Sequence, residues 1–223
     1  LSAGDEQIIP NTGPDVRDAA QSNNPILTYL ATVQAVLSCS VHQEALMTLV
    51  NEISRCWSFD RVALGVVNGD KIEVKALSHS AHFDARSNLV GNMQQAMTEV
   101  QQKSRGLCFP SSETADLACY SGHQRLLMER NDYVLISLPL QDNDQTVAVL
   151  LCEFQGEAGE TNQLASQQLA TQHLAELNTL AELLGPLVIL HQRGSQSIPE
   201  HIEFRSRVRL TQLYQGRFGK LPL

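Results

Sequence analysis

The strongest constraint on the fold is a turn signal, Asn68-Gly69-Asp70, that separates two apolar segments. An Asn-Gly pair readily adopts the positive backbone φ angles of a two-residue hairpin turn. The segment before it, 61–67, is rich in Val, Ala and Leu, whereas the segment after it, 71–77, alternates between apolar and polar residues. Because alternation with a period of two places apolar side chains on one face, the sequence predicts an antiparallel, half-buried pair of strands.

A second pair of strands is predicted further along the chain. The apolar segment Tyr133–Leu140 is followed by the turn-forming residues Gln141–Asp144 and then by Thr146–Phe154. The last segment is apolar throughout, which favours a strand at the centre of a sheet with both faces covered. A short strand at 106–109 is predicted to end at Pro110, which cannot donate to a strand ladder.

Helical periodicity accounts for most of the remaining chain. Apolar residues recur at spacings of three and four, which is the repeat of one helix face, in the segments 26–37, 46–57, 89–100 and 162–191. Within the last segment, Gly185-Pro186 predicts a kink or an end, because proline removes a backbone hydrogen bond at a cost of about 3 kcal/mol. Antiparallel strands with helices at both ends of the domain predict an α+β layered fold.

Composition bounds the class of protein. The 223 residues suffice for about one domain, and 43% hydrophobic with 18% charged residues is a globular balance. The net charge of -8 argues against nucleic-acid binding by the whole domain, because an acidic surface repels phosphate backbones. The five cysteines include no CxxC pair, which favours reduced thiols in the cytoplasm. No leader peptide and no run of about 20 apolar residues is evident, so we expect a soluble domain.

Charge and composition divide the chain into three parts. Residues 1–24 are polar, and Pro10, Gly13 and Pro14 lie close together in them. This composition predicts a flexible N-terminal arm. Residues 25–192 carry the periodic segments and form the predicted domain. Residues 193–223 form the predicted C-terminal tail, which is basic because Arg205 to Lys220 includes five Lys or Arg residues and no acid.

These elements resemble the GAF domain family. The resemblance rests on the hairpin 61–77, on the helix 92–102 that leads into Gly106-Leu107-Cys108-Phe109-Pro110, and on the closing strands 134–140 and 147–150. It covers about residues 28–190. It implies a fold related to profilin-like and PAS domains, with a central antiparallel six-stranded sheet and helices on both faces. The first, second and last helices would cover one face. The third helix, 89–100, and a fourth segment of mixed helical pattern, 111–130, would cover the other.

A narrower resemblance, to the cytoplasmic GAF region of HlyD-family membrane-fusion and secretion proteins, rests on Phe109-Pro110, 123–127, Pro139-Leu140 and 183–187. In that family a basic linker follows the domain and leads into a transmembrane helix. The basic tail would then lie next to an inner membrane, where Lys and Arg are favoured. The alternative is a solvated surface tail. The domain is expected in the cytoplasm whether the tail lies next to a membrane or in solvent.

The resemblance also implies the sites. A ligand pocket would lie beneath the third and fourth helical segments, with the candidate lining residues Phe83, Met93, Met97, Cys108, Cys119, His123 and Ser137. Domains of this kind usually form homodimers through their terminal helices. The last helix carries a heptad-like stripe that suits this role, namely Ala170, Leu174, Leu177, Ala181, Leu184 and Val188. The alternative is that the stripe packs only on its own sheet.

A few residues offer catalysis or metal binding as alternatives to this interpretation. Cys119 and His123 are four residues apart and would share a helix face, so with Cys108 they form a candidate zinc group, but a fourth ligand is not evident. Free methionine sulfoxide reductases use a GAF-type fold, but the third cysteine of that family is replaced here by the segment 128–132. No phosphate-binding loop or hydrolase motif occurs. We therefore expect no catalysis, metal or cofactor.

The predicted function is that of a regulatory or sensory domain. It would bind a small ligand or mediate dimerisation, and it would be coupled to a membrane or secretion adaptor. The alternatives are a purely structural dimerisation module without a ligand and, third, a thiol or metal enzyme such as a free methionine sulfoxide reductase.

Overall fold

A computed structural model describes residues 25–110, 117–128, 130, 132–156 and 160–217. At its centre, five strands form one sheet in the order β2-β1-β5-β4-β3, and all neighbouring strands are antiparallel. The strands are β1 (Arg61–Asn68), β2 (Lys71–Leu77), β3 (Leu107–Phe109), β4 (Tyr133–Asp142) and β5 (Gln145–Gln155). The predicted N-terminal arm, 1–24, lies outside the described residues.

The number of strands corrects the expectation of six. Each of the five segments with a strand pattern forms a strand, but no described segment supplies the sixth that the resemblance implies. After β2, the chain passes through turns at 78–87 and enters a helix, so it adds no strand beyond β2. On the other side of the sheet, β3 is the edge strand and pairs only with Leu135–Ser137 of β4.

Both predicted hairpins are confirmed. Asn68 pairs with Lys71 across the first turn, where Gly69 has a φ of 60°, a value that glycine adopts without steric cost. In the second turn, Asn143 and Asp144 have φ values of 50° and 62°, and both residue types tolerate this region. The prediction that β5 is central is also confirmed, because β1 and β4 lie on its two sides.

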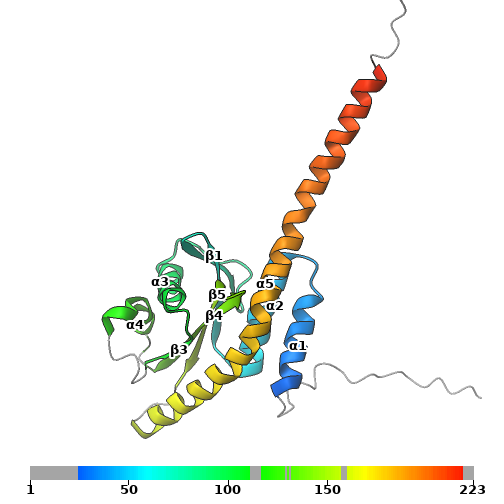
Figure 1. The fold of residues 1–223 in the computed structure, drawn as a ribbon. Helices are drawn as coiled ribbons and strands as arrows, with labels where there is room; N and C mark the ends of the chain where they lie inside the picture. Colours follow the sequence, from blue (N-terminus) through cyan, green and yellow to red (C-terminus); the bar gives the residue numbers. More distant parts are fainter. Residues whose placement is uncertain (1–24, 111–116, 129, 131, 157–159, 218–223) are drawn as a thin grey trace, which may run out of the picture.

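Helices cover both faces of the sheet, as predicted (Figure 1). One face carries α1 (Pro25–Leu37), α2 (His42–Trp57) and α5 (Glu160–Arg217), and the other carries α3 (Asn88–Lys103), a short 3-10 helix η3 (Leu117–Tyr120) and α4 (Ser121–Leu127). Two apolar cores result, one on each side of the sheet. Side chains alternate along each strand, so neighbouring residues of β4 and β5 enter opposite cores.

The last helix is longer than predicted. The expected interruption at Gly185-Pro186 does not end it, and α5 continues to Arg217, so most of the predicted tail is helical. Figure 1 shows that α5 changes direction between its yellow and orange parts. Gly185 packs so closely on β4 that a Cβ atom there would lie 1.8 Å from the Gln141 carbonyl oxygen. This contact offers a reason why the helix continues here, since packing offsets the cost of Pro186.

Part of α5 is also strongly apolar. Among the described residues, one helical stretch, Leu164–Gly194, is long and apolar enough to cross a membrane by length and composition alone. In this structure the stretch packs on the sheet, where Leu177, Leu180 and Leu184 are each no more than 1% exposed. A helix that covers a sheet needs the same apolar composition, so its hydropathy is accounted for by the core.

Candidate functional site

Three polar side chains, two of them buried and one half-buried, form a hydrogen-bonded chain beneath α4. The His123 ring lies between two partners: its Nδ1 is 2.7 Å from Oε2 of Glu99, and its Nε2 is 2.9 Å from Oγ of Ser137. His123 and Ser137 are each 0% exposed. The chain therefore joins α3, α4 and β4 inside the apolar core of that face.

The local sequence explains how the three side chains meet. Ser137 lies in the middle of β4 and shares a face with Leu135, which belongs to the core beneath α3 and α4. His123 is brought close to α3 by Gly122, because a Cβ atom at Gly122 would lie 2.4 Å from the backbone nitrogen of Ala96. The backbone N–H of Gly122 also donates to Oε1 of Glu99 at 2.6 Å. A glycine here is thus a requirement of the site.

The electrostatics favour an ionised Glu99. Burial acts to raise the pKa of Glu99, but the hydrogen bonds from His123 and from the Gly122 backbone outweigh it and hold the pKa below its usual value. A carboxylate can only accept, so Nδ1 of His123 carries a proton and donates to it. The other ring nitrogen, Nε2, then accepts from the Ser137 hydroxyl when the ring is neutral and donates to it when the ring is protonated.

Two aromatic rings, one from the edge strand β3 and one from η3, pack around the histidine. The ring centroids of Phe109 and Tyr120 lie 5.6 Å and 5.9 Å from that of His123. Lys103 in turn places its ammonium group 3.6 Å from the centroid of the Tyr120 ring, a cation–π contact. These contacts reduce access of water to the polar chain, and a low local dielectric strengthens its hydrogen bonds.

The order carboxylate, imidazole, hydroxyl is the one that activates serine in hydrolases. Here the geometry offers no access, because Ser137 is 0% exposed and lies within β4 between β3 and β5. A substrate could reach Ser137 only if α4 moved away. As it stands, the arrangement fastens α4 and α3 to the sheet.

The structure brings together part of the predicted pocket. His123 and Ser137 were both predicted to line it, and they are in direct contact. Met93 and Met97 lie on the same face and are fully buried, and a Cβ atom at Gly65 of β1 would come within 2.5 Å of the Met97 sulfur. Phe83 packs at the margin of the same core. The two methionines, which were predicted to line the pocket, therefore pack tightly in the core on this side of the sheet.

The structure does not bring the predicted cysteines to this place. Cys108 lies on β3 but packs against the core on the α5 side, so the sheet separates it from His123. Cys119 is exposed on η3. The candidate zinc group of Cys108, Cys119 and His123 is therefore not assembled. Within the described residues, no group of three or more His, Cys, Asp or Glu side chains is placed to hold a metal ion.

Sequence reasoning missed Glu99. The signal was present, because Glu99 follows Ala96 by three residues and therefore lies beside the apolar face of α3. A carboxylate next to a buried helix face needs a partner, and the histidine of the next helix supplies it. Only the close approach of α3 and α4 at Gly122 identifies that partner, and no local pattern predicts this approach.

The predicted dimer stripe lies in the core of its own domain. Its members Ala170, Leu177, Ala181, Leu184 and Val188 are at most 6% exposed, and Leu174 is half-buried against the same core. They pack on the sheet and on α1 and α2, which was the alternative considered for this stripe. In this structure these six residues are therefore not a free surface.

The comparison with solved structures identifies the fold. The GAF domain of A. aeolicus NLH2 in an inactive state matches with a TM-score of 0.53 at 13% identity, and the match covers 79% of this chain and 99% of that chain. The GAF domain of a phosphoenolpyruvate-protein phosphotransferase from Acinetobacter matches with a TM-score of 0.53 at 13% identity, over 78% and 99%.

A bacteriophytochrome, RpBphP3 of R. palustris, matches with a TM-score of 0.52 at 12% identity, over 91% of this chain and 44% of that chain. No family model matches the sequence, and no curated protein matches it. Identities this low establish the architecture alone. The sheet order, the helices on its two faces and these similarities together show that the chain has the fold of GAF domains.

Proposed function

We propose that the chain is a regulatory domain in which a small ligand acts on the α3 and α4 face and α5 carries the response. The observation that supports this proposal best is the buried chain from Glu99 through His123 to Ser137. It is the polar centre of one face, and it is held by a helix of only seven residues. A fixed core needs no such group, because apolar side chains would fill the same volume.

The strand β4 offers a route from that face to α5. Ser137 points toward α3 and α4, whereas its neighbours Ile136 and Leu138 belong to the core on the α5 side. A ligand that replaced the contact between His123 and Ser137 would displace α4 and relieve β4 of that contact. Such a ligand shifts the equilibrium only by the difference in its affinity for the two arrangements.

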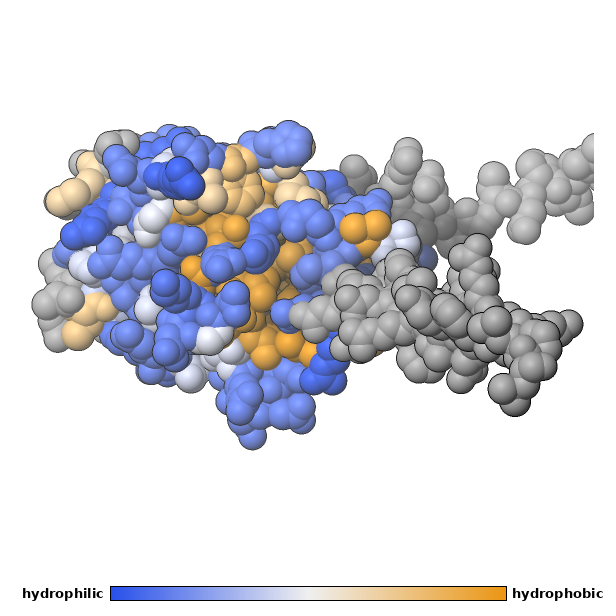
Figure 2. Space-filling view, turned by 90° about the horizontal axis from the view of Figure 1, so that it is seen from above, coloured by the Kyte–Doolittle hydropathy of each residue, from blue (hydrophilic) through white to orange (hydrophobic). Residues whose placement is uncertain are grey.

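Dimerisation is proposed through exposed apolar residues of the terminal helices. On α1, Ile26, Leu30 and Leu37 are more than half exposed, and on α5 Leu190 is 60% exposed. The three residues of α1 are spaced by four and by seven positions, which are the spacings of a helix-packing stripe. Figure 2 shows that, on the face seen from above, apolar surface gathers in a band between hydrophilic areas. Exposed apolar residues in a row on a terminal helix are typical of a contact between chains.

A purely structural dimerisation module is the second candidate function. The observation that favours it is the close packing of Met93 and Met97 where a ligand was expected. A cytoplasmic location and coupling to a membrane or secretion adaptor remain predictions, which rest on the basic composition of 205–220 and on the resemblance noted above. The sequence of the full-length protein tests the adaptor: a hydrophobic segment after Leu223 would support it.

The ligand proposal is tested by comparing the purified wild-type protein with a variant that lacks the Ser137 hydroxyl. Native mass spectrometry of the wild-type protein from cell extract is expected to show added mass from a bound small molecule. Ser137→Ala is expected to lose that mass. The matched control is Ser54→Ala, which removes a buried serine hydroxyl on the opposite face. No added mass in wild type, with a dimer present, would favour the structural module instead.

A further inference from the structure

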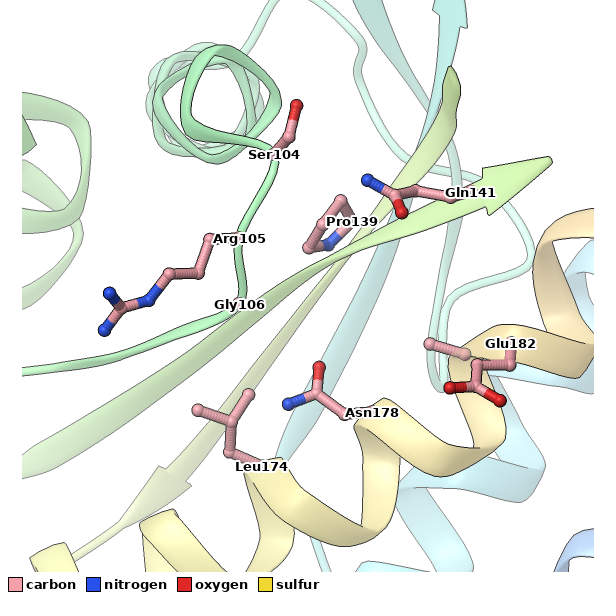
Figure 3. A pocket seen from close by; sticks show the side chains of 9 residues that line it. Ser104, Arg105, Gly106, Pro139, Gln141, Leu174, Asn178 and Glu182 are labelled. Carbon is pink, nitrogen blue, oxygen red and sulfur yellow. The ribbon is translucent and has the colours of Figure 1, made fainter. Parts of the chain in front are cut away.

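A groove of about 500 Å³ lies away from the polar chain, between α5, the end of β4 and the turn between α3 and β3 (Figure 3). Three segments far apart in the sequence line it: 104–106, 139–141 and 174–182. This volume is within the range of sites that hold metabolite-sized ligands. The proposed function makes no use of this groove.

Two close contacts fix the shape of the groove. A Cβ atom at Gly106 would lie 3.0 Å from Cδ1 of Leu174 and 3.1 Å from Oδ1 of Asn178, so this glycine lets the turn approach α5. Gly185 makes the corresponding approach of α5 to Gln141 at the end of β4. At Gly106 the backbone of the turn packs against side chains of α5, and at Gly185 the backbone of α5 packs against the backbone of β4. Direct packing at both places therefore forms the walls of the groove.

The walls present hydrogen-bonding groups that the protein does not use. Figure 3 shows the amide groups of Asn178 and Gln141 directed toward the space over Pro139. Within the described part of the chain, neither amide group nor the Glu182 carboxylate has a hydrogen-bond or ion-pair partner. Each amide both donates and accepts, so the pair suits a polar ligand.

One end of the groove is acidic and favours a cation. Glu182 lies at this end (Figure 3). The walls from β4 and α5 come from the stretch between Asn131 and Gln192, which contains no Lys or Arg. Arg105 is the one basic residue that lines the groove in the described chain, and Figure 3 shows its guanidinium group directed away from Asn178 and Glu182. A negative potential in a concave site raises the local concentration of cations.

We propose that this groove binds a small organic cation, an amine of metabolite size. Its ammonium group pairs with Glu182, and its polar or aliphatic body lies over Pro139 and Leu174 between the amides of Asn178 and Gln141. Such a ligand would bridge α5 and the turn that follows α3. The inference stands on the groove alone and is independent of the function proposed for the α3 and α4 face.

The test is a titration followed by ¹⁵N–¹H NMR of the full chain with three probes of similar length: putrescine, 1,4-butanediol and succinate. Putrescine is expected to shift the signals of Gly106, Gln141 and Asn178, whereas the neutral diol and the dianion are not. Glu182→Gln is expected to weaken putrescine binding about fivefold, the effect of one partly exposed ion pair. The spectrum itself reports whether each variant is folded.

The matched control is Glu44→Gln, which removes the same charge from an exposed position on α2. It is expected to leave the affinity for putrescine unchanged. Equal weakening by Glu44→Gln would show only diffuse attraction to an acidic protein and would overturn the proposal. Signals unmoved by putrescine, or moved equally by butanediol or succinate, would overturn it as well.

Discussion

The two faces of the sheet bury different kinds of side chain. Beneath α1, α2 and α5 the core is almost entirely apolar, with large residues such as Leu46, Leu138 and Leu150 fully buried. Beneath α3 and α4, the core also holds the polar chain of Glu99, His123 and Ser137. An apolar core tolerates small shifts, whereas a buried polar network is stable only when every partner is in place. The second face is therefore the one on which we propose that a ligand acts.

A second buried polar pair extends this contrast. Glu153 of β5 lies on the same side of the sheet as Leu151 and is 3% exposed, and its Oε2 accepts from Nη2 of Arg61 at 2.6 Å. Burial raises the pKa of Glu153, and Arg61 opposes that rise. The other oxygen, Oε1, has no hydrogen-bond partner among the described residues. Arg61 therefore offsets only part of the cost of burying the Glu153 carboxylate.

The largest expected effect comes from breaking that pair. Arg61→Leu leaves the Glu153 carboxylate buried without its cation, so the free energy of unfolding is expected to fall by about 3–5 kcal/mol. The double variant Arg61→Leu/Glu153→Leu removes both charges and is expected to recover most of that loss. Urea denaturation measures both. A double variant as unstable as the single one would contradict the electrostatic explanation.

The next largest effect tests the apolar face. In Gly185→Ala, the new methyl group meets the Gln141 backbone, which cannot move aside as a side chain can. The free energy of unfolding is expected to fall by about 2–3 kcal/mol, the cost of overpacking. Gly194→Ala is the control on the same helix, because nothing lies within 4 Å of its Cβ position. That variant is expected to gain up to about 1 kcal/mol from helix propensity.

Local patterns predicted the layers of the fold, and the family resemblance predicted part of the site. The turn at Asn68-Gly69 and the apolar run of β5 specify the two hairpins, since turn chemistry and alternation are local properties. The resemblance to the GAF family, and not a local pattern, placed His123 and Ser137 in one pocket, and the two are in contact. Glu99 and the continuation of α5 past Pro186 depend on contacts between distant segments, at Gly122 and Gly185. A pattern along one segment carries no information about such contacts.

A smaller effect is expected within the polar chain. Glu99→Gln removes the negative charge that holds the His123 ring, and a neutral amide cannot accept from both His123 and Gly122 as well as a carboxylate does. We expect the free energy of unfolding to fall by about 2 kcal/mol, the value of a hydrogen bond to a charged group. Glu44→Gln, on exposed α2 surface, is expected to change stability by less than about 0.5 kcal/mol.

Acid is expected to weaken the two faces in different pH ranges. On the α5 side, burial lowers the pKa of His42, with His191 and Lys75 adding to the effect, and burial lowers the pKa of His173 against the opposing influence of Glu176. The unfolded chain therefore binds more protons than the folded chain just below pH 6.5, and stability falls as the pH falls through this range. The pKa of Glu99 is also lowered. The stability that the ionised Glu99 contributes is therefore lost at lower pH, below about 4.5.

Variants separate the two ranges. His42→Gln with His173→Gln is expected to flatten the dependence of unfolding free energy on pH between about 6.5 and 5, and Glu99→Gln to flatten it below about 4.5. Urea denaturation at a series of pH values measures both slopes. If Glu99→Gln changed the upper range instead, the assignment of the two ranges to the two faces would be wrong.

Hydrogen exchange tests the central claim most directly, because it reports the opening of each helix separately. In Ser137→Ala, the account predicts faster exchange of the α4 amides, a change in the α5 amides that pack on β4, and unchanged exchange in α2. In the matched variant Ser54→Ala, it predicts faster exchange near α2 and unchanged α4. Exchange in α4 that is identical in wild type and Ser137→Ala would contradict the claim that this buried chain holds α4 to the sheet.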